Sequence, residues 1–199
     1  MTRPIAARIS LRALSENLAL ARRYAPGSRM LSVIKANAYG HGLIRTAGAL
    51  SASEGFALLD LDDALSLRQA GYRQKIVLLE GFFSLDELDE ISENGIDVVI
   101  HCREQIEMLE SRRLKKKVDV FLKCNTGMNR LGFRPELFWK MIGRLKENEN
   151  AGEIVSMTHF CCADGEEGVK GQMDVFEAAS EGSNLPASLA NSAALIRYP

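Results

Sequence analysis

Residues 97–124, DVVIHCREQIEMLESRRLKKKVDVFLKC, contain one complete strand–helix–strand pattern. The apolar runs Asp97–His101 and Val118–Cys124 lack strict polar alternation, which is typical of strands buried on both faces of a parallel sheet. Glu104–Leu114 lies between them and has the apolar spacing of a helix. Because a helical crossover is the usual connection between two parallel strands, this segment predicts a β/α repeat unit.

Similar units extend from this segment in both directions. Further apolar strands are predicted at Met30–Lys35, Gly55–Leu59, Ile76–Glu80, Ile154–Phe160 and Ser188–Asn191. Further helices are predicted through Leu11, Leu14, Leu18 and Ala21, and at Leu61–Ala70, Ser84–Asn94 (with Ser84 and Glu87 at the spacing of a capping box) and Arg134–Glu147. Ala6–Ser10 is a candidate for one more strand outside this series.

The regular alternation predicts an α/β fold. Seven successive strand–helix units favour a TIM-type (β/α)8 barrel over a doubly wound sheet. No linker or low-complexity segment divides the chain, so we expect residues 1–199 to form one domain. A closed barrel needs an eighth strand to remove its two open edges. We therefore expect an incomplete barrel, with about seven of eight units present, in a fragment of a longer protein.

The composition argues against several classes of function. The 25 Lys and Arg residues nearly balance the 26 Asp and Glu residues, so nucleic acid or an anionic membrane surface is not expected as a partner. No apolar run approaches the roughly 18 residues of a membrane span, and the N-terminus does not resemble a signal peptide. Three histidines without paired spacing make a metal site improbable, and the four cysteines are expected to be reduced thiols of a cytoplasmic protein.

Polar motifs follow the predicted strands, and the first contains Lys35. The segment 33–42, VIKANAYGHG, places this lysine at the end of an apolar run. Partial burial of a lysine amine lowers its pKa and makes it available as a nucleophile or base. A lysine in such a position is, however, more often an ordinary side chain that reaches back to water. The motif alone therefore leaves both interpretations open.

Three more motifs occupy equivalent positions. Arg130 lies in KCNTGMNRLG (123–132) after the fifth strand, and it could offer a fixed fork of donors to a carboxylate or phenolate. His159 ends the next strand, and Ser192 lies in ANSAA (190–194) after the last one. Taken singly, these residues are more often a solvated arginine, a core histidine and a helix cap. Their joint occurrence at successive strand ends is a stronger indication of a site, because a barrel collects strand ends at one rim.

The motifs resemble those of a known family. Lys35-Ala-Asn-Ala-Tyr39-Gly-His-Gly is similar to the cofactor-lysine motif of bacterial alanine racemases, which are fold-type III pyridoxal 5′-phosphate enzymes. Lys123…Gly127-Met-Asn-Arg130-Leu-Gly, Ser156-Met-Thr-His159-Phe and Asn191-Ser192-Ala-Ala resemble the later motifs of that family, in the same order. The resemblance covers essentially all 199 residues.

The resemblance implies a role for each matching residue. Lys35 would hold pyridoxal phosphate as a Schiff base and act as the base on the D-alanine side. Tyr39 and Ser192 would contact the cofactor phosphate, and His159 would lie against the pyridine ring. Arg130 would bind the phenolic oxygen of the cofactor and the carboxylate of the substrate.

Two further residues have implied supporting roles. Lys123 matches a lysine that is often carboxylated in the family, a modification that orients the arginine, and Asn191 would lie near the cofactor.

The implied activity is the interconversion of L- and D-alanine by a cytoplasmic homodimer, for peptidoglycan synthesis or alanine catabolism. The second base would be a tyrosine from a C-terminal β domain of the partner subunit, beyond Pro199. These residues alone are therefore expected to be inactive or weakly active.

A second interpretation is a non-catalytic binding module. Single-domain pyridoxal-phosphate homeostasis proteins share the barrel and the cofactor lysine. The Tyr39-Gly-His-Gly and Gly127-Met-Asn-Arg130-Leu-Gly motifs favour the racemase over this class. Other fold-type III enzymes, such as amino-acid decarboxylases, match the motifs less well.

Overall fold

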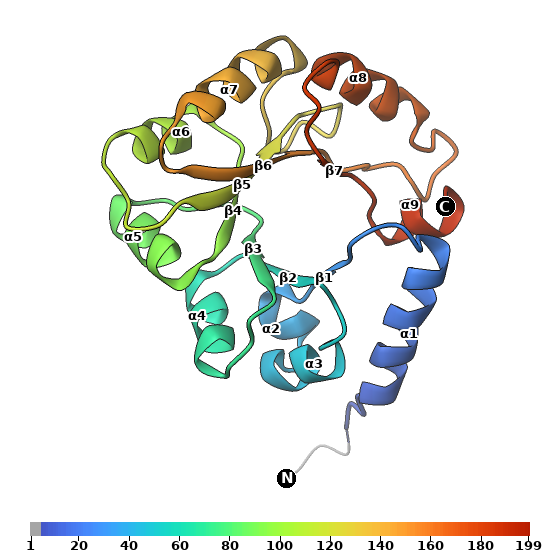
Figure 1. The fold of residues 1–199 in the computed structure, drawn as a ribbon. Helices are drawn as coiled ribbons and strands as arrows, with labels where there is room; N and C mark the ends of the chain where they lie inside the picture. Colours follow the sequence, from blue (N-terminus) through green and yellow to red (C-terminus); the bar gives the residue numbers. More distant parts are fainter. Residues whose placement is uncertain (1–4) are drawn as a thin grey trace.

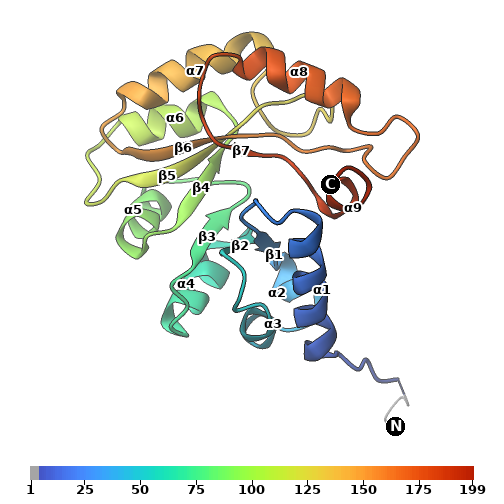
Figure 2. The ribbon, with the colours of Figure 1, turned by 45° about the vertical axis from the view of Figure 1, so that its right-hand side comes forward.

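The apolar runs of the sequence form a curled parallel sheet. A computed structural model describes residues 5–199, in which seven parallel strands pair in chain order. They are β1 (Leu31–Val33), β2 (Gly55–Leu58), β3 (Lys75–Leu78), β4 (Asp97–Ile100), β5 (Val118–Lys123), β6 (Ala151–Met157) and β7 (Ala187–Ser188). The sheet curls into an open barrel with helices on its outer side (Figure 1; Figure 2). This confirms the predicted incomplete TIM-type barrel, because a doubly wound sheet would reverse its strand order.

Helices connect the strands around the outside of the barrel. They are α1 (Leu11–Tyr24), α2 (Lys35–Tyr39), α3 (Leu43–Ala49), α4 (Leu61–Gln69), α5 (Leu85–Asn94), α6 (Arg103–Glu110), α7 (Pro135–Glu147), α8 (Lys170–Ser180) and α9 (Ser192–Arg197). The predictions of α1, α4, α5, α6 and α7 are confirmed, whereas α2, α3, α8 and α9 were not predicted. Helix α1 contacts α9 on the side where the edge strands β1 and β7 are not paired with each other (Figure 1).

One predicted strand is wrong. Residues 6–10 form no strand: they are largely exposed and pair with no neighbour. Instead, Ser10 begins α1, and its side-chain oxygen accepts a hydrogen bond from the backbone N–H of Ala13 at 3.2 Å.

Helix α6 ends at Glu110, four residues before the predicted end at Leu114. The side chain of Asn150 explains the difference. Its amide group donates to the carbonyl oxygen atoms of Leu109 and Arg112, and its oxygen accepts from the N–H of Leu114. These bonds replace the next helical turn and satisfy backbone groups that would otherwise be left unpaired.

The capping box predicted at the start of α5 forms with a small shift. The hydroxyl of Ser84 accepts from the N–H of Glu87 at 3.2 Å, as expected. The carboxylate of Glu87 reaches one residue further back and accepts from the N–H of Phe83 at 2.6 Å. Both bonds satisfy amide groups that have no partner inside the helix, and they fix the direction in which the chain enters α5.

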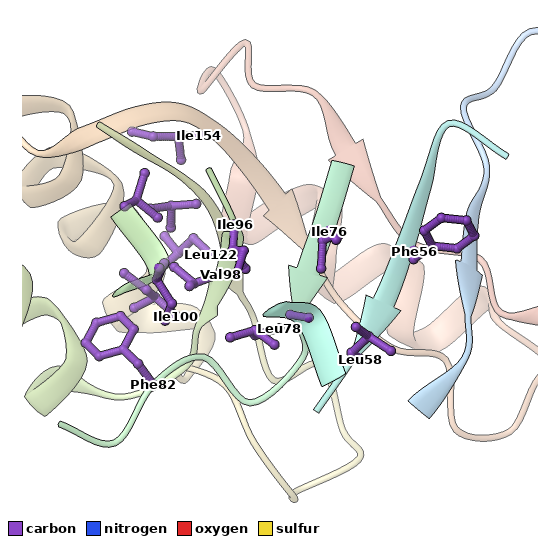
Figure 3. Close-up of a cluster of buried hydrophobic side chains, with 14 of the residues drawn as sticks. Phe56, Leu58, Ile76, Leu78, Phe82, Ile96, Val98, Ile100, Leu122 and Ile154 are labelled. Atoms are coloured by element: carbon purple, nitrogen blue, oxygen red, sulfur yellow. The ribbon is translucent and has the colours of Figure 1, made fainter. Parts of the chain in front are cut away.

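The main core lies between the strands and the helices. Alternate strand residues such as Phe56, Ile76, Val98 and Leu122 point outward to this layer and are fully buried (Figure 3). Burial of each such side chain contributes about 1.5–3 kcal/mol relative to exposure. This layer is what holds the barrel wall and the helices together.

The opposite face of each strand fills the barrel interior in layers. Ala57, Val77, Val99, Phe121 and Val155 form a second apolar cluster there. Because side chains alternate along a strand, the residues two positions further along also point inward, at the carboxyl rim. On β5 that residue is Lys123.

An ionic layer lies below the apolar one, at the amino ends of the strands. The amine of Lys75 is 3.1 Å from a carboxylate oxygen of Asp97, 2.6 Å from one of Asp119 and 3.5 Å from one of Glu153. Burial raises the pKa of the Asp97 carboxyl to about 6, although the charge of Lys75 acts in the opposite direction. The amine of Lys75 and these carboxylates therefore close this end of the barrel as a network of opposite charges.

Two observations complete the description of residues 5–199. None of their helices is long and apolar enough to cross a membrane. None of their histidine, cysteine, aspartate and glutamate side chains gather in threes as metal ligands would.

Candidate active site

Four of the predicted site residues converge at the carboxyl ends of the strands. Lys35 follows β1, Lys123 ends β5, Arg130 lies in the next loop and His159 follows β6. Burial lowers the pKa of the Lys123 amine, and the nearby charges of Arg130 and Lys35 lower it further. Burial also lowers the pKa of the His159 imidazole, and the same cations and Lys123 act in the same direction. Because such influences weaken rapidly with distance, these four groups share one site.

The site has an excess of positive charge. Within residues 5–199, no carboxylate lies within salt-bridge distance of Lys35, Lys123 or Arg130. Glu80, which follows β3, is the nearby acidic group, and its charge acts to raise the pKa of Lys123. Lys123 is only 7% exposed. A buried cation without a paired carboxylate is costly, so this site favours an anionic ligand.

Lys35 is presented by a left-handed turn. Strand β1 ends at Val33, two residues before the predicted strand end, and α2 then winds with φ of 53° at Ala36, 53° at Asn37 and 55° at Ala38. A left-handed helical conformation costs about 1–2 kcal/mol per residue for side chains larger than glycine. Such strain is kept where the surrounding structure enforces it, and it is concentrated at functional sites.

Local hydrogen bonds hold this turn. The N–H of Gly40 donates to the carbonyl of Ala36, and the N–H of Gly42 donates to the carbonyl of Asn37. The side-chain oxygen of Asn37 accepts from the N–H of Leu43 at 2.8 Å, which ties the turn to the start of α3. The His41 ring nitrogen Nδ1 lies 2.7 Å from the carbonyl oxygen of Ala38. The Nδ1 atom of His41 is therefore used to support the loop.

The loop that carries Arg130 is closed at its base. The N–H of Asn125 donates to the carbonyl of Phe133, and the N–H of Phe133 donates to the carbonyl of Lys123, each at 2.8 Å. The side-chain oxygen of Asn125 also accepts from the N–H groups of Gly127 and Asn129. Arg130 itself is exposed, and it lines a pocket of about 440 Å³ with His101 and Arg134, a pocket that Lys35, Lys123 and His159 do not line. Because the loop is fixed but the guanidinium is not, Arg130 can adjust to a ligand.

Asn191 connects the last two strand ends. Its amide nitrogen donates to the carbonyl of Phe160 at 2.7 Å, and its oxygen caps α9 by accepting from the N–H of Ala194 at 2.9 Å. These bonds hold the His159 segment against the start of α9. The amide is thus already used in positioning the protein's own loops.

Tyr39 and Ser192 are less closely associated with the cluster. Tyr39 is 59% exposed, and Ser192 is exposed at the first residue of α9. Neither side chain makes a hydrogen bond with another described residue. The structure therefore brings together Lys35, Lys123, Arg130 and His159, and leaves these two at its edge.

Two residues near the site were not singled out by the sequence patterns. Glu80 occupies the end of a predicted strand, as the other site residues do, and this position was an available signal. Gln172 lies in α8, and its contacts with the loops after β5 and β6 depend on tertiary packing. No local sequence pattern identifies it.

Comparisons with known proteins agree with the fold and with the motifs. The family model for the N-terminal domain of alanine racemase matches residues 9–199. An alanine racemase of Nitrosospira multiformis is 52% identical over 202 residues, which cover 100% of this chain and 57% of that protein. The solved structure of a biosynthetic alanine racemase from Pseudomonas aeruginosa has a TM-score of 0.90 at 35% identity, over 95% of this chain and 54% of that one. An alanine racemase structure from Acinetobacter baumannii has a TM-score of 0.87 at 35% identity, over 96% and 58%.

The barrel and its cationic rim define a class of α/β-barrel proteins with a lysine-bearing site. Within that class, the chain belongs to the alanine racemase family, in which it corresponds to the N-terminal domain. The chain spans about 57% of the length of the curated relative from Nitrosospira.

Proposed function

We propose that this chain binds pyridoxal 5′-phosphate through Lys35 and supplies one half of an alanine racemase site. The observation that carries the proposal is the cationic cluster at the carboxyl rim, in which neither Lys35, Lys123 nor Arg130 forms a salt bridge with a carboxylate of residues 5–199. The cofactor is an anion with a phosphate and a phenolic oxygen, and it carries an aldehyde that reacts with an amine. The donor set of the site fits these groups.

The residues of the chain would divide the work of binding. Lys35 would form a covalent, reducible bond through its amine, and Tyr39 and Ser192 would reach the phosphate. Arg130 would donate to the phenolic oxygen and then to the substrate carboxylate, where its planar fork gives orientation. The lowered pKa of His159 favours a neutral imidazole, which can lie against an aromatic ring without placing another charge in the cationic site.

Lys123 has a separate proposed role. Its lowered pKa increases the neutral fraction of its amine, and a neutral amine adds carbon dioxide with release of one proton. The carboxylated side chain would be an anion next to Arg130. It would neutralise part of the cluster and hold the guanidinium in one orientation.

The chemistry needs a proton to leave one face of the substrate and another to arrive on the opposite face. When bound, the cofactor supplies delocalisation for the electron pair that remains at Cα. Lys35 would remove or return the proton on the D-alanine face. We propose that the second base comes from another domain and subunit of a cytoplasmic homodimer, as the family resemblance implies, and that the product serves peptidoglycan synthesis or alanine catabolism.

Exchange of the alanine Cα proton tests this division. The purified chain is mixed with pyridoxal phosphate in deuterium oxide, and loss of the Cα proton signal of D-alanine or L-alanine is followed by NMR. We expect D-alanine to exchange faster than L-alanine, because Lys35 serves one face only. Lys35→Met should slow the exchange of D-alanine by at least about a hundredfold. Exchange that survives in Lys35→Met, or equal rates for both enantiomers, would contradict the proposal.

A further inference from the structure

Gln172, the third residue of α8, connects two loops of the site. Its amide nitrogen donates to the hydroxyl oxygen of Thr126 at 2.9 Å and to the carbonyl oxygen of His159 at 3.0 Å. Its amide oxygen accepts from the N–H of Cys161 at 2.8 Å. Both donors and the acceptor of the side chain are therefore in use, so the amide group is held in one orientation.

A directed chain of hydrogen bonds continues from Thr126 into the core. The hydroxyl of Thr158 donates to the carbonyl of Cys124 at 3.0 Å, which uses its only proton. In the 2.8 Å contact between the two hydroxyls, Thr126 must therefore be the donor, and it accepts in turn from Gln172. Thr126 and Thr158 are 6% and 2% exposed, and hydrogen bonds at such low exposure are expensive to leave unmade.

These contacts join the segments that carry two site residues. Thr126 lies in the loop that leads to Arg130, and Thr158 directly precedes His159. The loop after β5 and the loop after β6 are thus held to each other, and both are held to helix α8. These bonds, together with the pairing of β5 and β6, hold the Arg130 loop close to the His159 segment.

We propose that Gln172 is a positioning residue, which sets the distance between the Arg130 loop and His159 and so the width of the ligand site between them. The identity of the ligand rests on the proposed function, whereas the arrangement of the two loops rests on the hydrogen bonds described above. Gln172 itself touches neither ligand nor reacting atoms. Its effect passes through the backbone of His159 and the hydroxyl of Thr126.

Two substitutions separate the parts of this role. Gln172→Met keeps the length of the side chain and removes the hydrogen bonds to Thr126, His159 and Cys161. Gln172→Glu keeps an oxygen that accepts from Cys161, but it cannot donate to the carbonyl of His159, and the single proton of Thr126 cannot serve both the new carboxylate and Thr158.

Lys170→Met is the matched control, because it places a methionine in the same turn of α8, where the lysine pairs with Asp174 at the surface.

The first readouts concern the protein without ligand. Gln172→Met should speed amide hydrogen exchange at Cys161 by about tenfold, whereas Gln172→Glu and Lys170→Met should leave it within about threefold of the native rate. The imidazole of His159 is then titrated by NMR. Gln172→Met should move its pKa upward, toward the ordinary histidine value, because a loosened site admits water and lets the cations move away. Far-UV circular dichroism and Tm confirm that each variant is folded.

The last readout is the affinity for pyridoxal phosphate, measured by absorbance. Both Gln172 variants should raise its Kd by about tenfold, and Lys170→Met should not change it. An unchanged His159 titration in Gln172→Met, or native affinity in both Gln172 variants, overturns the positioning role. If the native chain binds no pyridoxal phosphate, the proposed function fails, and the His159 titration by itself then decides whether Gln172 is a positioning residue.

Discussion

Individual residues at the two ends of the barrel are charged and buried, with opposite consequences. At the amino end, Lys75 is surrounded by carboxylates. At the carboxyl end, Lys123 is more deeply enclosed but has other cations as neighbours. The first arrangement pairs a cation with carboxylates of the protein, whereas the second leaves positive charge for a ligand to neutralise.

The unusual ionisation of Asp97 predicts a pH-dependent stability. Its pKa is about 6 in the folded protein, against an ordinary value of 3.8. Between about pH 4 and pH 6 the folded state therefore binds more protons than the unfolded state, so the free energy of unfolding falls as pH rises. The loss from this group is about 3 kcal/mol across the window.

Urea unfolding at pH 4 and at pH 7 measures this effect. In Asp97→Asn the free energy of unfolding should fall by about 3 kcal/mol less between these pH values than in the native protein, because the amide does not titrate. Asp174→Asn, at an exposed position of α8, should keep the native pH profile. The same decrease in Asp97→Asn as in the native protein would show that another group is responsible.

Replacement of Lys123 should separate stability from binding. Lys123→Met removes a buried charge and keeps most of the volume, so the free energy of unfolding at pH 7 should stay the same or rise by up to about 1 kcal/mol. If Lys123 has the proposed carboxylated form, the Kd for pyridoxal phosphate should rise, because Arg130 would lose the anion that orients it. Lys117→Met, at an exposed position, serves as the control for both measurements. A loss of stability above about 2 kcal/mol would mean that Lys123 has favourable contacts in the folded protein.

At the scale of elements, the left-handed turn α2 departs most from the conformation that its sequence favours. Alanine favours right-handed helix, yet Ala36 and Ala38 have positive φ. The seven strands and the helices α1, α4, α5, α6 and α7 follow from apolar spacing, and their predicted bounds lie within a few residues of the observed ones. The turn could not be predicted in this way, because its conformation is imposed by bonds to Gly42 and Leu43 and not by local preference.

A glycine substitution tests the strain in this turn. Ala36 is exposed with φ of 53°, so Ala36→Gly should raise the free energy of unfolding by about 1 kcal/mol. The matched change Ala19→Gly, in the middle of α1 and also exposed, should lower it by about 0.5–1 kcal/mol. Chemical unfolding of both variants gives the comparison. A decrease of equal size in the two would rule out strain at Ala36.

Helices α3 and α8 illustrate a second limit of sequence analysis. Neither has a side-chain cap at its start, since Gly42 precedes α3 and Val169 precedes α8. Their positions are set by packing, as in the contact between Phe176 of α8 and Phe138 of α7, whose ring centroids are 6.4 Å apart. The role inferred for Gln172 depends on this packing and was equally inaccessible from the sequence.

At the scale of the whole molecule, the layers of the barrel interior separate support from chemistry. The ionic layer around Lys75 closes one end, an apolar layer follows, and the cationic cluster occupies the other end. The barrel class and the residues Lys35, Arg130 and His159 could be predicted, because each follows an apolar strand and all strands of a parallel barrel end at one rim. Glu80 ends a predicted strand in the same way and could have been included on the same ground.

Borohydride reduction is the most direct test of the assignment of Lys35. The chain is loaded with pyridoxal phosphate and reduced, and its peptides are mapped by mass spectrometry. We expect one pyridoxyl adduct, on the peptide that contains Lys35, and none in Lys35→Met treated in the same way. An adduct on Lys123 or on any other lysine of the native protein, with Lys35 unmodified, would contradict the account.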